Sequence, residues 1–105
     1  MNWPPTHLRS VAIVGADEAG ARIAMSFLDA GIPVTLVAHG RGALEGGVAL
    51  IRRTYESQVR QRTLAEYKYA VRMAFLSTTT NDADIASADV VIESCAGGRG
   101  TSSDA

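Results

Sequence analysis

The sequence predicts an α/β domain built on a parallel sheet. Three observations support this prediction: short runs rich in β-branched residues alternate with longer stretches of helical periodicity, glycine or proline separates them, and a glycine-containing turn joins the first run to the first helix. Residues 11–37 contain all three features. A strand, a helix and a second parallel strand imply a right-handed crossover in a sheet that helices cover.

The elements of this crossover follow in order along the chain. An apolar, β-branched run at residues 11–14 predicts the first strand, and Gly15 bounds it. Apolar residues then recur every three or four positions between Ala19 and Leu28, which predicts one apolar face of a helix. That helix should end at Gly31, and the run at residues 34–37 predicts the second strand.

A pair of helices is predicted after the second strand. The segment from His39 to Gly42 is a turn, and the long helical pattern that follows has apolar residues at positions 44, 48, 51, 55 and 59. Gly46 and Gly47 weaken its first turns by about 1 kcal/mol each. A second helical pattern follows with almost no loop, and its apolar residues are Leu64, Tyr67, Val71 and Phe75. The two patterns predict an antiparallel helical hairpin that projects from the sheet.

Two more strands complete the predicted sheet. Residues 76–80 are a short, threonine-rich strand candidate. Residues 81–89 should form a turn with one or two helical turns, and residues 90–92 are a fully apolar fourth strand.

Length and composition predict a single cytoplasmic domain. In a chain of 105 residues, the domain should span residues 9–96, with a flexible lead at 1–8 and a flexible tail at 97–105. The formal net charge of −1 argues against binding to nucleic acid. The single cysteine, Cys95, excludes an intrachain disulfide, and no apolar run reaches the roughly 18 residues of a membrane span. These features favour a protein without nucleic-acid or membrane partners.

The turn between the first strand and the first helix partly matches a dinucleotide-binding fingerprint. Its residues are Gly15, Ala16, Asp17, Glu18, Ala19 and Gly20. In the fingerprint G-x-G-x-x-G, the second glycine lets a pyrophosphate approach the backbone. Here Asp17 stands at that position and places a carboxylate where the phosphate would come, and Glu18 adds a second negative charge. The Asp17 carboxylate can instead cap the helix, where the dipole stabilises it by about 0.3–1 kcal/mol.

A second departure lies at the end of the second strand. A residue that binds the ribose hydroxyls is normally an acid about 20 residues past the turn, and Ala38 stands there instead. His39 and Arg41 follow, and they are the remaining candidate cofactor contacts. Arg41 could bind a 2′-phosphate, which would favour NADP over NAD. Because a lone arginine after a strand is more often a surface residue, NAD is the favoured cofactor.

Three segments of the chain resemble one known family. They are IAMSFLDAGIPVTLV, ALEGGVALIRRTYESQV and RMAFLSTTTNDADIASADVVIES. From Ser10 to Cys95 the chain is similar to the N-terminal NAD-binding domain of the bacterial and mitochondrial 3-hydroxyacyl-CoA dehydrogenases, including the dehydrogenase half of multifunctional fatty-acid oxidation enzymes. The resemblance implies a Rossmann-like parallel sheet of strand order 3-2-1-4, with a helical hairpin after the second strand, and NAD as the cofactor.

The resemblance carries over to only some positions. Gly15, Ala16 and Gly20 match the phosphate turn of the family, whereas Ala19 falls where the family usually has methionine. Glu93 matches the glutamate at the end of the family's fourth strand. Together with the departures at positions 17 and 38, this pattern implies that cofactor binding is weak or lost.

The resemblance also bears on catalysis and on partners. It implies that the catalytic histidine, its glutamate partner and the substrate-binding serine and asparagine of the family lie beyond the end of this sequence, and neither His7 nor His39 matches them. No residue is therefore a candidate for catalysis or for metal binding. One hypothesis is an NAD(H)-binding domain that does not catalyse alone. The alternative is a structural or assembly module that has lost the cofactor, and a third is a gene truncated or shifted in frame. We expect the exposed edge of the fourth strand to be covered by a homodimer contact or a partner chain.

Overall fold

The computed structural model describes residues 9–94 and confirms the α/β class. The four strands are β1 (Val11–Val14), β2 (Val34–Val37), β3 (Leu76–Thr79) and β4 (Val90–Glu93). The helices are α1 (Glu18–Asp29), α2 (Arg41–Arg60), α3 (Glu66–Ala74) and the short 3₁₀ helix η1 (Asp82–Ile85). The predicted lead at 1–8, the tail at 97–105 and Cys95 lie outside the described residues. None of the helices in residues 9–94 combines the length and apolar character that crossing a membrane requires.

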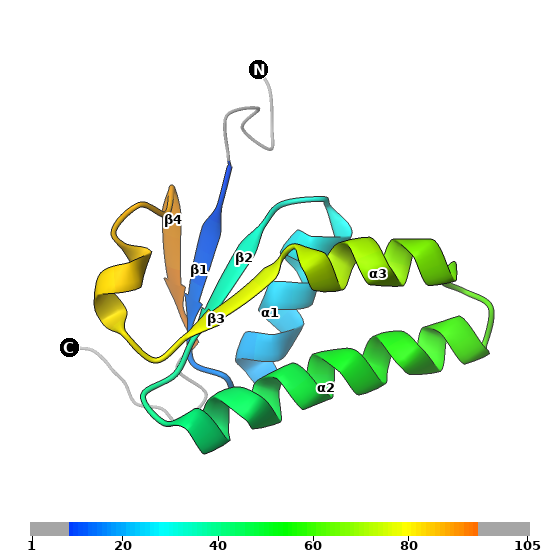
Figure 1. Cartoon of the computed structure of the whole chain (residues 1–105), viewed down its shortest axis with the longest axis horizontal. Helices are drawn as coiled ribbons and strands as arrows, with labels where there is room; N and C mark the ends of the chain where they lie inside the picture. Colours follow the sequence, from blue (N-terminus) through cyan, green and yellow to red (C-terminus); the bar gives the residue numbers. More distant parts are fainter. Residues whose placement is uncertain (1–8, 95–105) are drawn as a thin grey trace.

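The sheet has the topology that the sequence predicts. Its strands lie in the order β3-β2-β1-β4, and every neighbouring pair is parallel (Figure 1). The register pairs Val14 with Val37 on one side and with Glu93 on the other, so the carboxyl ends of β1, β2 and β4 lie level. Because parallel strands present their carboxyl ends at one edge, the loops after these strands converge there.

The core lies between the sheet and the helices α1 and α2. Val11 and Ile13 of β1, on the same face of the sheet, pack in one cluster with Leu28 of α1 and with Ile51 and Tyr55 of α2. All five are almost completely buried. The periodicity of α1 and α2 therefore corresponds to their buried sides, as the amphipathic pattern predicts.

The helical hairpin of α2 and α3 extends away from the sheet on the side opposite η1 and β4 (Figure 1). Tyr55 ties it to α1, because its hydroxyl donates to Asp29 Oδ1 at 2.7 Å. Arg72 of α3 lies 3.2 Å from the same Asp29 carboxylate and over the Tyr55 ring, 5.5 Å from its centroid. These three side chains, the Tyr55–Asp29–Arg72 cluster, therefore join all three long helices.

The hairpin differs from the sequence prediction in two ways. The loop between the helices covers residues 61–65, with Arg62 at φ 63°, rather than being almost absent. Of the four apolar residues whose spacing predicted the second helix, only Leu64 is buried; Tyr67, Val71 and Phe75 are 69 %, 50 % and 36 % exposed.

The opposite side of α3 packs inward instead. Tyr69 and Met73 lie against the core cluster, and the Tyr69 ring meets the Tyr55 ring edge-on at 6.3 Å between centroids. The Tyr69 hydroxyl also donates to Glu56 Oε2 at 3.0 Å. The side of α3 that faces the core is therefore set by its aromatic contact and hydrogen bond with α2. It is not the side that the spacing of its apolar residues predicts.

Candidate functional site

A cleft of about 530 Å³ opens at the carboxyl edge of the sheet, where β1, β2 and β4 end. Its lining includes Gly15, Ala16 and Asp17 after β1, Ala38 and His39 after β2, and Glu93 and Ser94 at the end of β4. Open parallel sheets bind ligands at this edge, outside the carboxyl ends of their strands. We therefore take the cleft as the candidate functional site.

The turn after β1 needs glycine at both ends. Gly15 has φ +115°, and a Cβ there would lie 2.9 Å from the Ser94 carbonyl oxygen. A Cβ on Gly20 would lie 1.8 Å from the Gly15 carbonyl oxygen, a separation that no side chain can adopt. Gly15 permits the positive φ of the turn, and Gly20 permits the close approach of α1 to the turn. These are the roles that the fingerprint assigns to its first and third glycines.

Asp17 is the N-cap of α1, as its position in the sequence suggests. Its Oδ1 accepts from the Gly20 backbone N–H at 2.8 Å and from the Ser94 hydroxyl at 2.8 Å. An amide of the first helical turn, which could donate to a phosphate, is thus already bonded to a carboxylate of the chain itself. The contact with Ser94 spans 77 residues and is a feature that the sequence did not predict.

Gly47 of α2 packs against the turn, which the sequence analysis also missed. A Cβ on Gly47 would lie 2.7 Å from the Ala16 carbonyl oxygen and 2.8 Å from the Ala16 Cβ. Gly46, its neighbour, has open space around the same position. Gly47 therefore lets the backbone of α2 support Ala16 directly. A glycine inside a helical pattern can mark such a close packing contact, and this is the signal that could have indicated it.

A family model described as the NAD binding domain of 3-hydroxyacyl-CoA dehydrogenase matches residues 10–97. The chain belongs to this family. The match covers the whole sheet, the glycine turn and the helical hairpin.

Individual relatives of this NAD-binding domain agree with the family match. A curated relative is the peroxisomal fatty acid beta-oxidation multifunctional protein MFP2 of Arabidopsis thaliana, 27 % identical over 89 residues, which are 85 % of this chain and 12 % of the plant protein. The (S)-3-hydroxybutyryl-CoA dehydrogenase PaaH1 of Ralstonia eutropha has a similar structure, with a TM-score of 0.83 and 28 % identity. The comparison covers 88 % of this chain and 32 % of PaaH1.

A third relative is also much longer than the part that matches this domain. The 3-hydroxybutyryl-CoA dehydrogenase of Escherichia coli K12 superimposes with a TM-score of 0.80 and 28 % identity, over 83 % of this chain and 18 % of that protein. The domain described here thus spans about an eighth of the curated relative and between about a fifth and a third of these two structures.

The NAD-binding domain brings together part of the predicted cofactor site. Gly15, Ala16, Asp17, Ala38 and His39 all line the cleft. Ala38 is nearly buried, and its methyl group leaves the cleft without a carboxylate at the end of β2. The exposed His39 imidazole lies 3.4 Å from the Asp82 carboxylate of η1.

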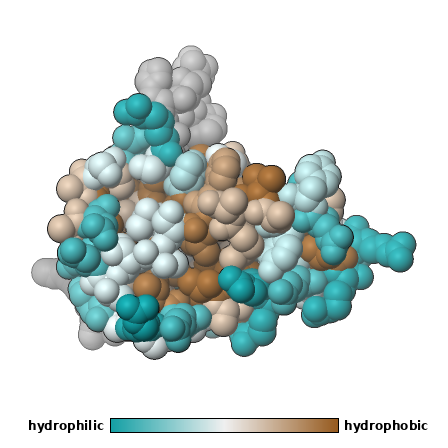
Figure 2. All heavy atoms as spheres, viewed as in Figure 1, coloured by the Kyte–Doolittle hydropathy of each residue, from teal (hydrophilic) through white to brown (hydrophobic). Residues whose placement is uncertain are grey.

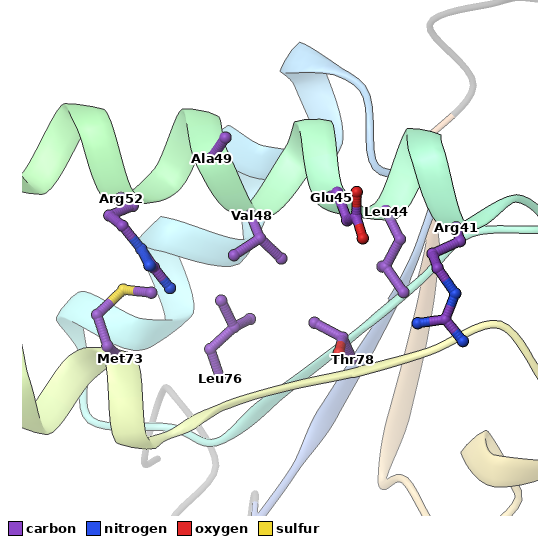
Figure 3. Close-up of a pocket in the computed structure, with 9 residues that line it drawn as sticks. All are labelled: Arg41, Leu44, Glu45, Val48, Ala49, Arg52, Met73, Leu76 and Thr78. Atoms are coloured by element: carbon purple, nitrogen blue, oxygen red, sulfur yellow. The ribbon is translucent and has the colours of Figure 1, made fainter.

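The remaining predicted site residues of this NAD-binding domain are not part of the cleft lining. Glu18 forms an exposed ion pair with Arg22 at 2.7 Å, and neither Glu18 nor Ala19 is part of the cleft lining. Gly20 acts through its amide and its packing rather than as part of the lining. Arg41 lines a separate groove between α2 and β3 (Figure 3). Arg41 is thus not part of the cleft lining, although its near neighbours His39 and Ala43 are.

The chemistry of the cleft is that of a binding site. Its described lining carries two carboxylates, Asp17 and Glu93, one hydroxyl and one imidazole, around small apolar residues. No group of three histidine, cysteine, aspartate or glutamate side chains in residues 9–94 is arranged to hold a metal ion. The glycine turn fits the backbone geometry that a dinucleotide needs, and the cleft has a carboxylate at position 17 and a methyl group at position 38.

Proposed function

We propose that this domain binds NAD(H) in the cleft at the carboxyl edge of the sheet, with low affinity, and supplies the cofactor half of a dehydrogenase without catalysing alone. The observation that carries the proposal is the glycine turn, in which Gly15 and Gly20 bring β1, the turn and α1 together at the mouth of the cleft. Backbone amides at a helix N-terminus attract phosphate through their N–H groups and the helix dipole. NAD binding in the family supports NAD rather than another nucleotide.

Two side chains explain why the affinity should be low. Asp17 holds the Gly20 amide and brings a negative charge to the position of the pyrophosphate. Because Asp17 is exposed, the repulsion from one phosphate charge is near the aqueous value of about 1 kcal/mol at 4 Å. The Ala38 side chain cannot accept hydrogen bonds from the ribose, and losing such bonds to a charged acceptor costs about 1.5–3 kcal/mol, or roughly ten- to hundredfold in affinity.

Hydride transfer sets a separate requirement. It needs a substrate carbon held against the nicotinamide and a base within hydrogen-bond reach of the substrate hydroxyl. We assign to residues 9–94 the first task only, which is to hold the cofactor. In this proposal the substrate site belongs to a further polypeptide segment, as the small fraction of each relative that the domain spans suggests.

Thermal unfolding with and without ligand tests cofactor binding. The protein is unfolded alone and with millimolar NAD, NADH, NADP and ADP, and a ligand at a hundred times its Kd stabilises the folded state by about 2.7 kcal/mol, which is several degrees in Tm. Because the proposed affinity is low, we expect the Tm shifts with NAD, NADH and ADP to be smaller than this value. The shift with NADP should be the smallest, because Arg41, the candidate contact for its 2′-phosphate, lines another groove. No shift with any nucleotide would refute the proposal.

Substitutions at position 17 test the reason for low affinity. Asp17→Asn keeps an acceptor for the Gly20 amide and removes the charge, whereas Asp17→Gly removes both. We expect NADH to bind about fivefold more tightly to the asparagine variant, matching the repulsion of about 1 kcal/mol, and more tightly still to the glycine variant. Glu66→Gln, an exposed acid on α3 away from the cleft, is the control for net charge. Equal affinity in all four proteins would show that Asp17 does not limit binding.

The second candidate function is an assembly module that pairs through β4. Val90 and Val91 are 37 % and 47 % exposed on this edge strand, and an exposed apolar edge favours pairing with another chain. Sedimentation velocity of the wild type and of Val91→Lys separates the two functions. A dimer that the lysine variant abolishes, together with no nucleotide effect on Tm, would favour the assembly module; a monomer that NADH stabilises would exclude it.

A further inference from the structure

A second hollow lies between α2 and the edge strand β3. Its volume is about 560 Å³, and it is lined by α2, by the end of α3 and by β3 (Figure 3). Figure 2 shows hydrophobic surface between α2 and β3 with hydrophilic atoms beside it. The volume falls within the range of roughly 300–1,000 Å³ that is typical of small-molecule sites.

The groove has an apolar floor. Leu44 and Val48 of α2 face Leu76 of β3 and Met73 at the end of α3 across the hollow (Figure 3). Leu44 is buried, and the other three are half-buried and pack against the edge of the core cluster. An apolar chain lying along this floor would cover side chains that now remain partly in contact with water.

The two ends of the groove are cationic. Arg41 and Arg52 both line it, and they are eleven positions apart in α2, which corresponds to about 16 Å along the helix axis. Neither guanidinium forms an ion pair with another residue in the range 9–94. Glu45, one turn after Arg41 on α2, is the one acid among the residues that line the groove, so the lining carries two positive groups and one negative group (Figure 3).

The Arg41 end is the better site for an anionic head group. Thr78 of β3 lines the groove and can donate its hydroxyl. Arg41 is in the first turn of α2, whose N-cap Gly40 offers no side-chain acceptor and whose first turn has no acid. The positive end of the helix dipole therefore adds to the guanidinium charge. At the Arg52 end, the apolar Met73 is the partner across the groove (Figure 3).

We propose that the α2–β3 groove binds a linear aliphatic anion, with its carboxylate between Arg41 and Thr78 and its chain over Val48 and Leu76. This site is separate from the cofactor cleft, since the residues that line the two hollows do not overlap. The proposal therefore does not depend on NAD binding.

Titration of the ¹⁵N-labelled full chain with octanoate, below its micelle concentration, tests the site. We expect saturable shifts of the amide signals of Leu44, Val48, Leu76 and Thr78. 1-Octanol and octylamine have the same chain without the negative charge, and we expect each to bind at least tenfold more weakly, because a charge-assisted hydrogen bond to the guanidinium is lost. Equal binding of octanol would refute the assignment of Arg41 as an anion site.

Two arginine substitutions on α2 provide a matched pair. Arg41→Gln should weaken octanoate binding about tenfold, whereas Arg53→Gln, an exposed arginine outside the groove, should leave it unchanged. Both should keep the Tm and the circular dichroism of the wild type, because both side chains are exposed. Octanoate binding that is absent at millimolar concentration, or that Arg41→Gln does not weaken, would overturn the proposal.

Discussion

Replacing each glycine of the Gly46–Gly47 pair by alanine separates helix propensity from packing. Both residues lie in α2, so alanine in place of either one removes about 1 kcal/mol of unfavourable glycine propensity. At Gly46 the new Cβ meets open space, and we expect the full stabilisation, which raises Tm by roughly 4–8 °C. At Gly47 the new Cβ would lie 2.7 Å from the Ala16 carbonyl oxygen, so backbone must move.

Overpacking of this kind costs about 1–3 kcal/mol. Gly47→Ala should therefore be less stable than Gly46→Ala by about that amount, and less stable than the wild type when the upper part of the range applies. Urea unfolding followed by circular dichroism at 222 nm measures the difference. If NAD(H) binds in the cleft, Gly47→Ala should also weaken it, because Ala16 lines the cleft, while Gly46→Ala should not. Equal stability of the two variants would refute the reasoning.

Two further predictions concern hydrogen bonds of the fold. Burial, followed by the hydrogen bond to Asp29, raises the pKa of Tyr55, so the folded state holds this proton more tightly than the unfolded state. The resulting stability is present below the unfolded pKa of about 10 and is lost as pH rises from there, with a slope of up to about 1.4 kcal/mol per pH unit. Urea unfolding should show that Tyr55→Phe is about 1 kcal/mol less stable than the wild type at pH 7. Between pH 10 and 11 the variant should lose less stability than the wild type. An unchanged dependence of stability on pH in this range would contradict this account. Ser94→Ala removes the hydrogen bond to Asp17 Oδ1, and we expect the folded state to lose about 0.5–1.5 kcal/mol of stability. The amide of residue 94, which donates to the Val14 carbonyl, should exchange its hydrogen faster. Unchanged exchange would show that the contact with Asp17 does not hold the end of β4.

The positions of the strands and helices could be predicted because each depends on local sequence. The β-branched runs at 11–14 and 34–37 are buried strands, and the helical periodicity of residues 44–59 is the buried side of α2. The N-cap role of Asp17 was also predictable, since it depends only on the next three residues.

What the sequence could not supply depends on contacts between distant segments. Gly47 looked like a weak position in a helix until α2 was placed against Ala16, 31 positions earlier. The inward side of α3 is set by Tyr69 meeting Tyr55. Arg41 follows β2 in the first turn of α2, and its place in the lining of the groove toward β3 could not be read from the sequence. The direction in which such side chains point is decided by tertiary contacts, which spacing alone does not encode.

The Tyr55–Asp29–Arg72 cluster has a consequence for how this domain can diverge. It holds the three long helices at the C-terminal end of α1, whereas the cleft lies at the N-terminal end of the same helix. Substitutions at the exposed positions of the cleft mouth, such as Asp17, thus leave this interhelical cluster untouched. A change of an exposed side chain at this rim should therefore alter ligand contacts without loosening the contacts that hold the helices together.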